Sequence, residues 1–142
     1  MDKSQNKKLR LSVFLHSGSY DRVHSAFSLA SVALAMGGEV EMFVMYGALY
    51  RLLKNAAEEV SGCGEEEVGK ALEKSLRTGA IRTVPEMISM CKKMGGLRIW
   101  ACSGSMALLG ISRNELIDEV DGSAGLAGFV EKLRRATALI YI

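Results

Sequence analysis

The sequence has little of what marks disulfide-rich, zinc-binding or membrane-spanning proteins. Among 142 residues it has one Pro and three Cys, and the cysteines, at 63, 91 and 102, show no CxxC spacing and no neighbouring His cluster. This arrangement predicts neither a disulfide framework nor a metal site, and it favours a reducing, cytoplasmic setting. The apolar segment LSVFL is too short for a signal-peptide core, and no window approaches the roughly 20 apolar residues of a membrane span. We therefore expect no metal, no cofactor and no membrane attachment.

Aromatic residues and unbalanced charge are also scarce. Aromatics make up 6% of the chain, charged residues 24% and hydrophobic residues 49%, and the net charge is +2. Four cations lie in the first ten residues, opposed there by one Asp, so the remaining sequence is slightly acidic. A basic segment without interleaved aromatics does not indicate nucleic-acid binding. We interpret residues 1–8 as a flexible basic tail and residues 9–142 as one domain, a size that suits a single hydrophobic core.

The first third of the chain has the spacing of a strand–helix–strand unit. Leu9–Leu15 is a short apolar run, and the polar loop HSGSYD follows it. Apolar residues recur at helical spacing over Arg22–Met36, and the pair Gly37-Gly38 ends that segment. Glu39–Met45 alternates before it becomes apolar, which predicts a second strand. Such units are parallel and right-handed in nearly all known proteins, which places the chain in the α/β class.

The middle of the chain departs from this alternation. Tyr46–Ala57 has the Leu spacing of a helix, but the following SGCGEEEVGK contains three Gly and three consecutive Glu. Glu66 and Lys70, four residues apart, suit an ion pair on an exposed helix. We therefore expect a helical insertion at about residues 47–82, whose acidic run is solvated and binds no metal.

The second half returns to alternating helices and strands. Thr83 and Pro85 suit the start of a helix whose Met-rich face ends at Gly95-Gly96, and Ser112 and Glu115 have capping-box spacing. The remaining expected elements are a strand at Leu97–Ala101, a short helix after Cys102, a short strand at Asp118–Asp121, a helix at Ser123–Ala136 and a strand at Leu139–Ile142. Together the elements predict a three-layer α/β domain with a mostly parallel five-stranded sheet.

Cys102 is the first candidate for chemistry, because it ends a predicted strand directly before a predicted helix. Ligands of parallel sheets gather at the carboxyl ends of the strands. The residues Ser103, Gly104, Ser105 and Met106 would offer free backbone N–H groups, which together with the helix dipole stabilise a thiolate, a persulfide or a sulfenate. We expect such a thiol to be within reach of solvent. The alternative interpretation is that Cys102 is a small side chain that packs closely where strand meets helix.

The loop after the first predicted strand is the second candidate site. His16 could deprotonate or orient a neighbouring thiol, or it could simply bond a loop carbonyl. In a flavodoxin-like strand order the first and third strands are neighbours, and His16 and Cys102 would then share one crevice. Ser17, Gly18 and Ser19 could cradle a small anion, although their loop matches no nucleotide-binding fingerprint.

Three blocks of the sequence carry a family resemblance: HSGSYDRVHSAFSLASVALAMGGEVEMFV, MCKKMGGLRIWACSGSMALLGI and GSAGLAGFVEKLRRATALIYI. They resemble the DsrE/DsrF/TusD-like sulfur-relay family, in particular its branch often labelled peroxiredoxin-like, and the resemblance spans Leu11 to Ile142. It implies a flavodoxin-like domain that assembles into trimers or hexamers and carries sulfur as a persulfide. The position that matches the family's sulfur-bearing Cys is Cys102, and the branch motif C-x-x-S-M is intact as CSGSM. The insertion around Cys63 is less typical of the family.

Two functions follow from these observations. The first is a sulfur-carrier or sulfurtransferase-type protein that relays sulfane sulfur between donor and acceptor proteins as a persulfide on Cys102. The second is a non-catalytic module that binds a small anion, a nucleotide or a partner in the same crevice, with Cys102 as packing. Peroxidase activity is not expected, because the sequence shows no partner thiol for Cys102. The apolar end of the chain and the edges of the sheet favour a homo-oligomer.

Overall fold

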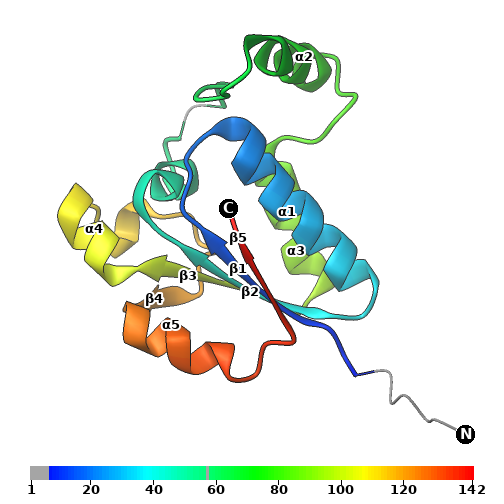
Figure 1. Cartoon of the computed structure of the whole chain (residues 1–142). Coiled ribbons are helices and arrows are strands. Elements are labelled where there is room, and N and C mark those ends of the chain that lie inside the picture. The colour runs from blue at the N-terminus through cyan, green and yellow to red at the C-terminus, as the bar shows by residue number, and fades with distance from the viewer. Residues whose placement is uncertain (1–6, 57) are drawn as a thin grey trace, which may run out of the picture.

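Five parallel strands form the centre of the structure, a computed structural model that describes residues 7–56 and 58–142 (Figure 1). The elements in chain order are β1 (Arg10–Leu15), α1 (Tyr20–Ala35), β2 (Glu39–Val44), the 3-10 helix η1 (Tyr46–Leu52), α2 (Glu66–Arg77), α3 (Val84–Met94), β3 (Leu97–Cys102), α4 (Ser103–Leu109), the 3-10 helix η2 (Arg113–Glu115), β4 (Gly122–Ala124), α5 (Leu126–Leu133) and β5 (Ala138–Tyr141). The predicted α/β fold class is confirmed. Residues 1–6 of the predicted basic tail lie outside the described residues.

The strand order is β4-β3-β2-β1-β5, and it corrects one expectation. β2 pairs with both β1 and β3, so the first and third strands are not neighbours. The reason is visible in the burial of β2, where Met42 and Val44 are buried on one face and Phe43 on the other. A strand that is apolar on both faces belongs in the interior of a parallel sheet. His16 and Cys102 therefore follow strands that lie about 10 Å apart across the sheet.

Helices cover the two faces of the sheet unequally. α1 and α3 lie side by side on one face, and the shorter α5 lies on the other (Figure 1). Strand alternation directs Val13, Met42 and Ile99 into the larger apolar cluster under α1 and α3. The opposite side chains enter a smaller cluster under α5, which contains Phe14, Phe43, Trp100, Cys102 and Phe129. The candidate thiol thus belongs to the α5 side of the sheet.

Several local signals in the sequence are confirmed. Thr83 begins α3 with a capping box, in which its side chain and that of Glu86 each accept the other residue's backbone N–H. Ser112 and Glu115 form the expected box at η2. In the insertion, α2 forms as a solvent-exposed helix, and its Lys70 ammonium lies 2.5 Å from the Glu66 carboxylate.

Three element boundaries differ from the predictions. The helix expected over 46–57 is the shorter η1, because the chain turns at Leu53 to bridge Leu116. The fourth strand forms at Gly122–Ala124 and not at 118–121. At Gly122 a Cβ would lie 3.1 Å from the Trp100 ring, so the glycine allows this edge strand to pair there. α5 consequently begins at Leu126, after the residues that β4 uses.

Tyr20 connects the insertion to the rest of the domain through hydrogen bonds of its hydroxyl. Its side chain is 1% exposed, and its hydroxyl donates to Glu58 Oε2 at 3.2 Å and accepts the Val84 backbone N–H at 3.4 Å. The Arg51 guanidinium lies 5.2 Å from the centre of the Tyr20 ring and donates to Ser61 Oγ at 2.7 Å. Burial raises the pKa of Tyr20 to about 12, and burial also raises the pKa of Glu58. One hydroxyl therefore joins the starts of α1 and α3 to the insertion loop.

We expect Tyr20→Phe to lower the free energy of unfolding by about 1–3 kcal/mol, because the Val84 N–H and the Glu58 carboxylate each lose a buried partner. Urea denaturation at neutral pH measures the change. Tyr50→Phe is the matched control, since Tyr50 is half exposed and its hydroxyl has no hydrogen bond within the described residues. Superimposable unfolding curves for wild type and Tyr20→Phe would contradict the assignment.

Candidate functional site

The carboxyl ends of β1, β2 and β3 lie at one edge of the sheet and present His16, Tyr46 and Cys102. These residues directly follow or end their strands, apart from the one-residue spacer Met45 after β2. The last residue of the chain joins the same edge, because the Ile142 carbonyl accepts the His16 backbone N–H at 2.7 Å. This edge is where parallel sheets place their ligands.

Cys102 is both the last residue of β3 and the N-cap of α4. Its sulfur accepts a hydrogen bond from the Ser105 backbone N–H, with an N–S distance of 3.4 Å. This is the N-cap position, where a side chain satisfies one of the free N–H groups of the first helical turn. A backbone donor therefore points at the sulfur, as the sequence predicted.

The exposure of the thiol differs from the expectation. Cys102 is 4% exposed and packs in the apolar cluster with Phe43, Met45 and Phe129. The rings of Phe43 and Phe129 stack with centroids 4.4 Å apart, so α5 packs on β2, the strand next to the one that carries the thiol. The Cys102 side chain thus has apolar neighbours, and its sulfur also accepts a backbone hydrogen bond.

Gly104 is an exposed residue beside the sulfur. It lies in the first turn of α4 and is solvent-exposed, and a Cβ at this position would lie 3.9 Å from Cys102 Sγ. Gly104 therefore has no side chain that could lie between its exposed surface and the sulfur.

Ser105 ties the thiol loop to the end of β2. Its side chain is 3% exposed, and its Oγ accepts the Tyr46 backbone N–H at 3.1 Å. Tyr46 has a φ of 47°, which makes it the one described residue other than glycine with a positive φ. Ser105 therefore holds a backbone conformation that is unfavourable for a Tyr, and its own N–H holds the Cys102 sulfur.

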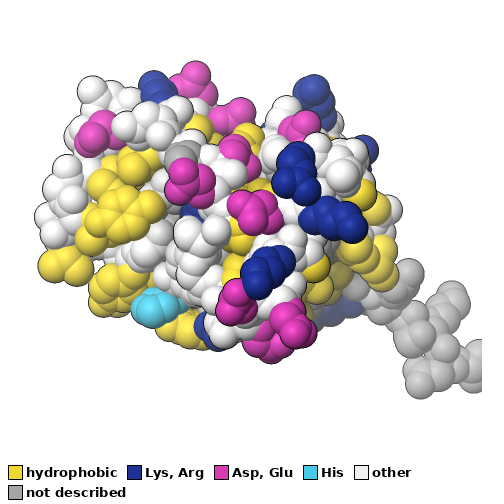
Figure 2. All heavy atoms as spheres, turned by 90° about the horizontal axis from the view of Figure 1, so that it is seen from above, with side chains coloured by type: hydrophobic (Ala, Val, Ile, Leu, Met, Phe, Trp, Pro, Cys, Tyr) yellow, Lys and Arg dark blue, Asp and Glu magenta, His cyan; other side chains and the backbone are white. Residues whose placement is uncertain are grey.

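The surface beside this edge is apolar. Figure 2 shows hydrophobic side chains gathered on the side of the molecule where α4 lies. The large exposed members on η1 and α4 are Tyr46, Tyr50 and Leu108, at 42%, 50% and 70% exposed. We call these three residues the η1/α4 patch.

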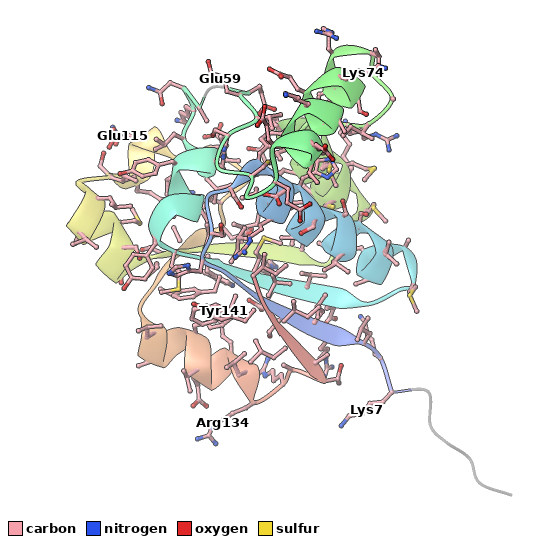
Figure 3. All side chains as sticks on the ribbon, turned by 45° about the horizontal axis from the view of Figure 1, so that its top comes forward. Lys7, Glu59, Lys74, Glu115, Arg134 and Tyr141 are labelled. Carbon is pink, nitrogen blue, oxygen red and sulfur yellow. The ribbon has the colours of Figure 1, made fainter. Side chains whose placement is uncertain are left out.

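His16 contacts aromatic rings and not the thiol. Its ring lies 5.0 Å from the Tyr46 ring in an edge orientation and 6.0 Å from the Tyr141 ring, nearly parallel to it. Tyr141 lies on the α5 side of the sheet (Figure 3) and stacks on Phe14 at 5.4 Å. Within the described residues no hydrogen bond joins His16 to Cys102, because β2 separates their strands. Any influence of His16 on the sulfur would pass through Tyr46 and Ser105.

The loop of Ser17, Gly18 and Ser19 is a tight turn. Gly18 is required there, since a Cβ would lie 2.5 Å from the Gly47 carbonyl oxygen. The two serine hydroxyls bond each other at 3.0 Å, and Ser17 Oγ also accepts the Ser19 N–H. The adjacent small cleft has Asp21, Glu65 and one Arg among its lining side chains. Two carboxylates against one guanidinium do not favour the small anion considered above.

The remaining site residues take ordinary structural places. Ser103 is exposed at the start of α4, and Met106 is half-buried against the larger apolar cluster. Cys91 is fully buried, and burial raises the pKa of its thiol, while Cys63 is half-buried in the insertion.

Within 7–56 and 58–142, no three His, Cys, Asp or Glu side chains gather as a metal site requires. No helix in the same ranges combines the length and hydrophobicity that crossing a membrane demands.

Sequence reasoning missed Tyr46 and Tyr141 as parts of this edge. A signal for Tyr46 was present, because the residue follows a predicted strand and precedes a glycine, the same position rule that singled out Cys102. Tyr141 carried no such signal, since only the pairing of β5 with β1 brings it beside Phe14 and His16.

Ser105→Ala should lower the free energy of unfolding by about 1–3 kcal/mol, because the Tyr46 N–H loses the acceptor that the buried Ser105 hydroxyl supplies. Chemical denaturation of the variant and of wild type measures this difference. Ser103→Ala, at an exposed hydroxyl on the same helix, is the control and should change stability by less than about 0.5 kcal/mol. Equal losses in the two variants would show that the Ser105–Tyr46 bond has no special role.

The chain is similar over nearly its whole length to several known proteins. The model of the DsrE/DsrF-like family matches residues 11–142. Two relatives are each 25% identical to the chain: the uncharacterized protein YrkE of Bacillus subtilis, over 94% of this chain and 96% of YrkE, and the sulfur carrier protein DsrE2 of Allochromatium vinosum, over 94% and 98%.

Two solved structures have the same fold. The YchN protein from E. coli has a TM-score of 0.63 at 14% identity, covering 94% of this chain and 99% of YchN. The protein of unknown function MTH1491 from Methanobacterium thermoautotrophicum has a TM-score of 0.61 at 17% identity, covering 95% and 100%. At these identities the two structures support the fold alone.

Proposed function

The chain belongs to the DsrE/DsrF-like family, and from this premise we propose that it relays sulfane sulfur as a persulfide on Cys102. The relative named as a sulfur carrier protein supports the general assignment. The family resemblance implies that Cys102 matches the family's sulfur-bearing Cys, and the residue stands in an intact C-x-x-S-M sequence. The proposed partners are a donor protein and an acceptor protein that exchange sulfur with this thiol.

The observation that carries the proposal is the hydrogen bond from the Ser105 N–H to the Cys102 sulfur. A backbone donor directed at the sulfur provides a hydrogen-bond partner for a thiolate or a persulfide at this position. A persulfide on the same side chain would keep its inner sulfur at this donor. The alternative, in which Cys102 serves only as packing, leaves this contact without a chemical role.

The proposed transfer needs no external oxidant or reductant. The Cys102 thiolate attacks the outer sulfur of a donor persulfide and forms a new S–S bond with it. The donor's own S–S bond breaks at the same time, and the donor leaves as a thiolate. In the second step an acceptor thiolate attacks the outer sulfur of the Cys102 persulfide, and Cys102 leaves as a thiolate. Each step exchanges one S–S bond for another, in the manner of thiol–disulfide exchange.

Access to the sulfur fits a carrier that releases its cargo only to a docked partner. Cys102 is 4% exposed, and exposed Gly104 lies beside its sulfur. The η1/α4 patch beside this route offers apolar surface for a partner that brings its own thiol. Burial between encounters would protect the persulfide from unselective thiols.

Intact-mass spectrometry tests the proposal directly. After incubation with glutathione persulfide, wild type should gain about 32 Da, the mass of one sulfur atom. Cys102→Ser should lose this adduct, whereas Cys63→Ser and Cys91→Ser should retain it. An adduct that persists in Cys102→Ser, or no adduct in wild type, would refute the proposal.

A second pair of variants tests the route past Gly104. Gly104→Val places branched carbons against the sulfur and should slow formation of the adduct, while the fold remains intact by circular dichroism. Gly64→Val is the matched control, because a Cβ at Gly64 meets no atom within 4 Å. Equal rates for the two variants would rule out the Gly104 route.

We also propose that the protein self-associates, as the family resemblance implies for trimers or hexamers. The outer edge of β5 has no strand partner within the described residues, and Leu139 and Tyr141 of this strand are 55% and 66% exposed. An apolar edge strand of this kind is usually covered in the assembled protein. Light scattering should return a multiple of the 15.4 kDa chain mass; a mass near that of one chain would contradict self-association.

A further inference from the structure

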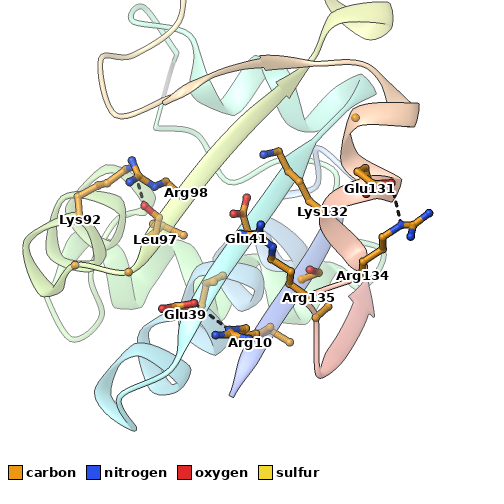
Figure 4. A pocket seen from close by; sticks show the side chains of 17 residues that line it. Arg10, Glu39, Glu41, Lys92, Leu97, Arg98, Glu131, Lys132, Arg134 and Arg135 are labelled. Carbon is orange, nitrogen blue, oxygen red and sulfur yellow. Dashed lines mark hydrogen bonds and ion pairs between the residues drawn. The ribbon is translucent and has the colours of Figure 1, made fainter. Parts of the chain in front are cut away.

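A separate cleft lies at the opposite end of the sheet from Cys102. It has a volume of about 1090 Å³ and opens over the amino-terminal halves of β1, β2 and β3, on the α5 side (Figure 4). The eight residues of α5 span about 12 Å, whereas a six-residue strand spans about 20 Å. α5 therefore covers the aromatic end of this face and leaves the other end open.

The cleft is strongly positive. Six Lys or Arg and three Glu line it: Arg10, Lys92, Arg98, Lys132, Arg134 and Arg135, with Glu39, Glu41 and Glu131. Six positive and three negative side chains leave a net charge of +3 in the cleft, which is more than the net charge of +2 of the whole chain. Lys8 and Asp121, which bond lining residues from outside, add one charge of each sign and leave the excess unchanged.

Most of these cations already have a carboxylate partner. Arg10 pairs with Glu39 at 3.3 Å and Arg134 with Glu131 at 2.9 Å. Asp121 accepts from both Lys92, at 2.5 Å, and Arg98, at 3.4 Å.

Lys132 and Arg135 differ from the others, because neither forms an ion pair within the described part of the chain. The Lys132 ammonium lies 4.2 Å from the centre of the Trp100 ring, whose Nε1–H donates to Glu41. Figure 4 shows Lys132 and Arg135 extending from the α5 side over the floor of the cleft near Glu41. These two side chains are the cations available to an incoming anion.

We propose that this cleft binds an acidic polypeptide segment of a partner protein, with Lys132 and Arg135 as its main contacts. In an extended segment, side chains on one face repeat about every 7 Å. A segment in which acidic and neutral residues alternate can therefore offer carboxylates to Lys132 and Arg135 without placing a negative charge at every position near Glu39 and Glu41.

The same geometry disfavours the other polyanions. A nucleic-acid backbone carries one charge on every phosphate and would meet the three glutamates of the cleft, and the Trp100 ring that could stack a base already holds Lys132. A small phosphate needs several free cations that converge on one point, but four of the six here are paired. Attraction of the peptide through exposed charges implies an affinity that falls as salt is added.

Fluorescence anisotropy with a labelled peptide of alternating Glu and Ser tests the proposal. The wild-type protein should bind this peptide and should not bind the matching Lys/Ser peptide. Its affinity for the Glu/Ser peptide should fall as the salt concentration rises. The double variant Lys132→Glu, Arg135→Glu should bind at least about tenfold more weakly. The control Lys74→Glu, Arg77→Glu changes the net charge equally on exposed α2 and should bind as wild type does.

Several outcomes would overturn the proposal. Equal losses in the two double variants would mean that net charge alone attracts the peptide. Displacement of the peptide by pyrophosphate or by a single-stranded oligonucleotide at lower concentration would assign the cleft to those ligands. A neutral variant, Lys132→Gln with Arg135→Gln, should also weaken binding, which separates lost contacts from a misfolded protein. Because the cleft-lining residues Leu97 and Arg98 lie about 13–17 Å along β3 from Cys102, adduct formation at Cys102 should be unchanged in all of these variants.

Discussion

The pairing of β2 with both β1 and β3 is the constraint on which the rest of the structure depends. Residues 42–44, the carboxyl-terminal half of β2, are apolar on both faces, so the strand takes an interior place in the sheet. Its end carries Tyr46 to a position between His16 and Cys102. Through the hydrogen bond from the Tyr46 N–H to Ser105, the end of β2 is fixed to the turn that holds the thiol. The chemistry available at this edge therefore follows from strand order as much as from the residues themselves.

The surroundings of Cys102 combine two opposing influences. The Ser105 N–H donates a hydrogen bond to the sulfur, and Phe43 and Phe129 belong to the apolar cluster in which Cys102 packs. In the proposed relay, a partner would approach this thiol along its polar side, beside Gly104. The burial of Cys102 is compatible with a carrier that holds sulfur between encounters.

The α5 face of the sheet is divided along its length into a charged end and an aromatic end. The parallel pairing places charged residues beside oppositely charged residues and aromatic residues beside aromatic residues. Arg10 lies beside Glu39, Glu41 beside Arg98, Phe14 beside Phe43, and Phe43 beside Trp100. Because α5 is short, it covers the aromatic row, and the charged row stays open as the positive cleft. One sheet face thereby carries the candidate thiol at one end and the proposed peptide site at the other.

The sequence by itself determined the α/β class, the local starts of helices such as the Thr83 capping box, and the place of Cys102 between a strand and a helix. These features depend on periodicity and on contacts a few residues apart, which the order of residues contains. Only the tertiary structure decided that β2 separates His16 from Cys102, that Gly122 and not Asp118 begins the fourth strand, and that Tyr141 stacks beside His16. Those outcomes depend on which strands pair and how closely they approach, and such long-range packing energies leave no local pattern in the chain.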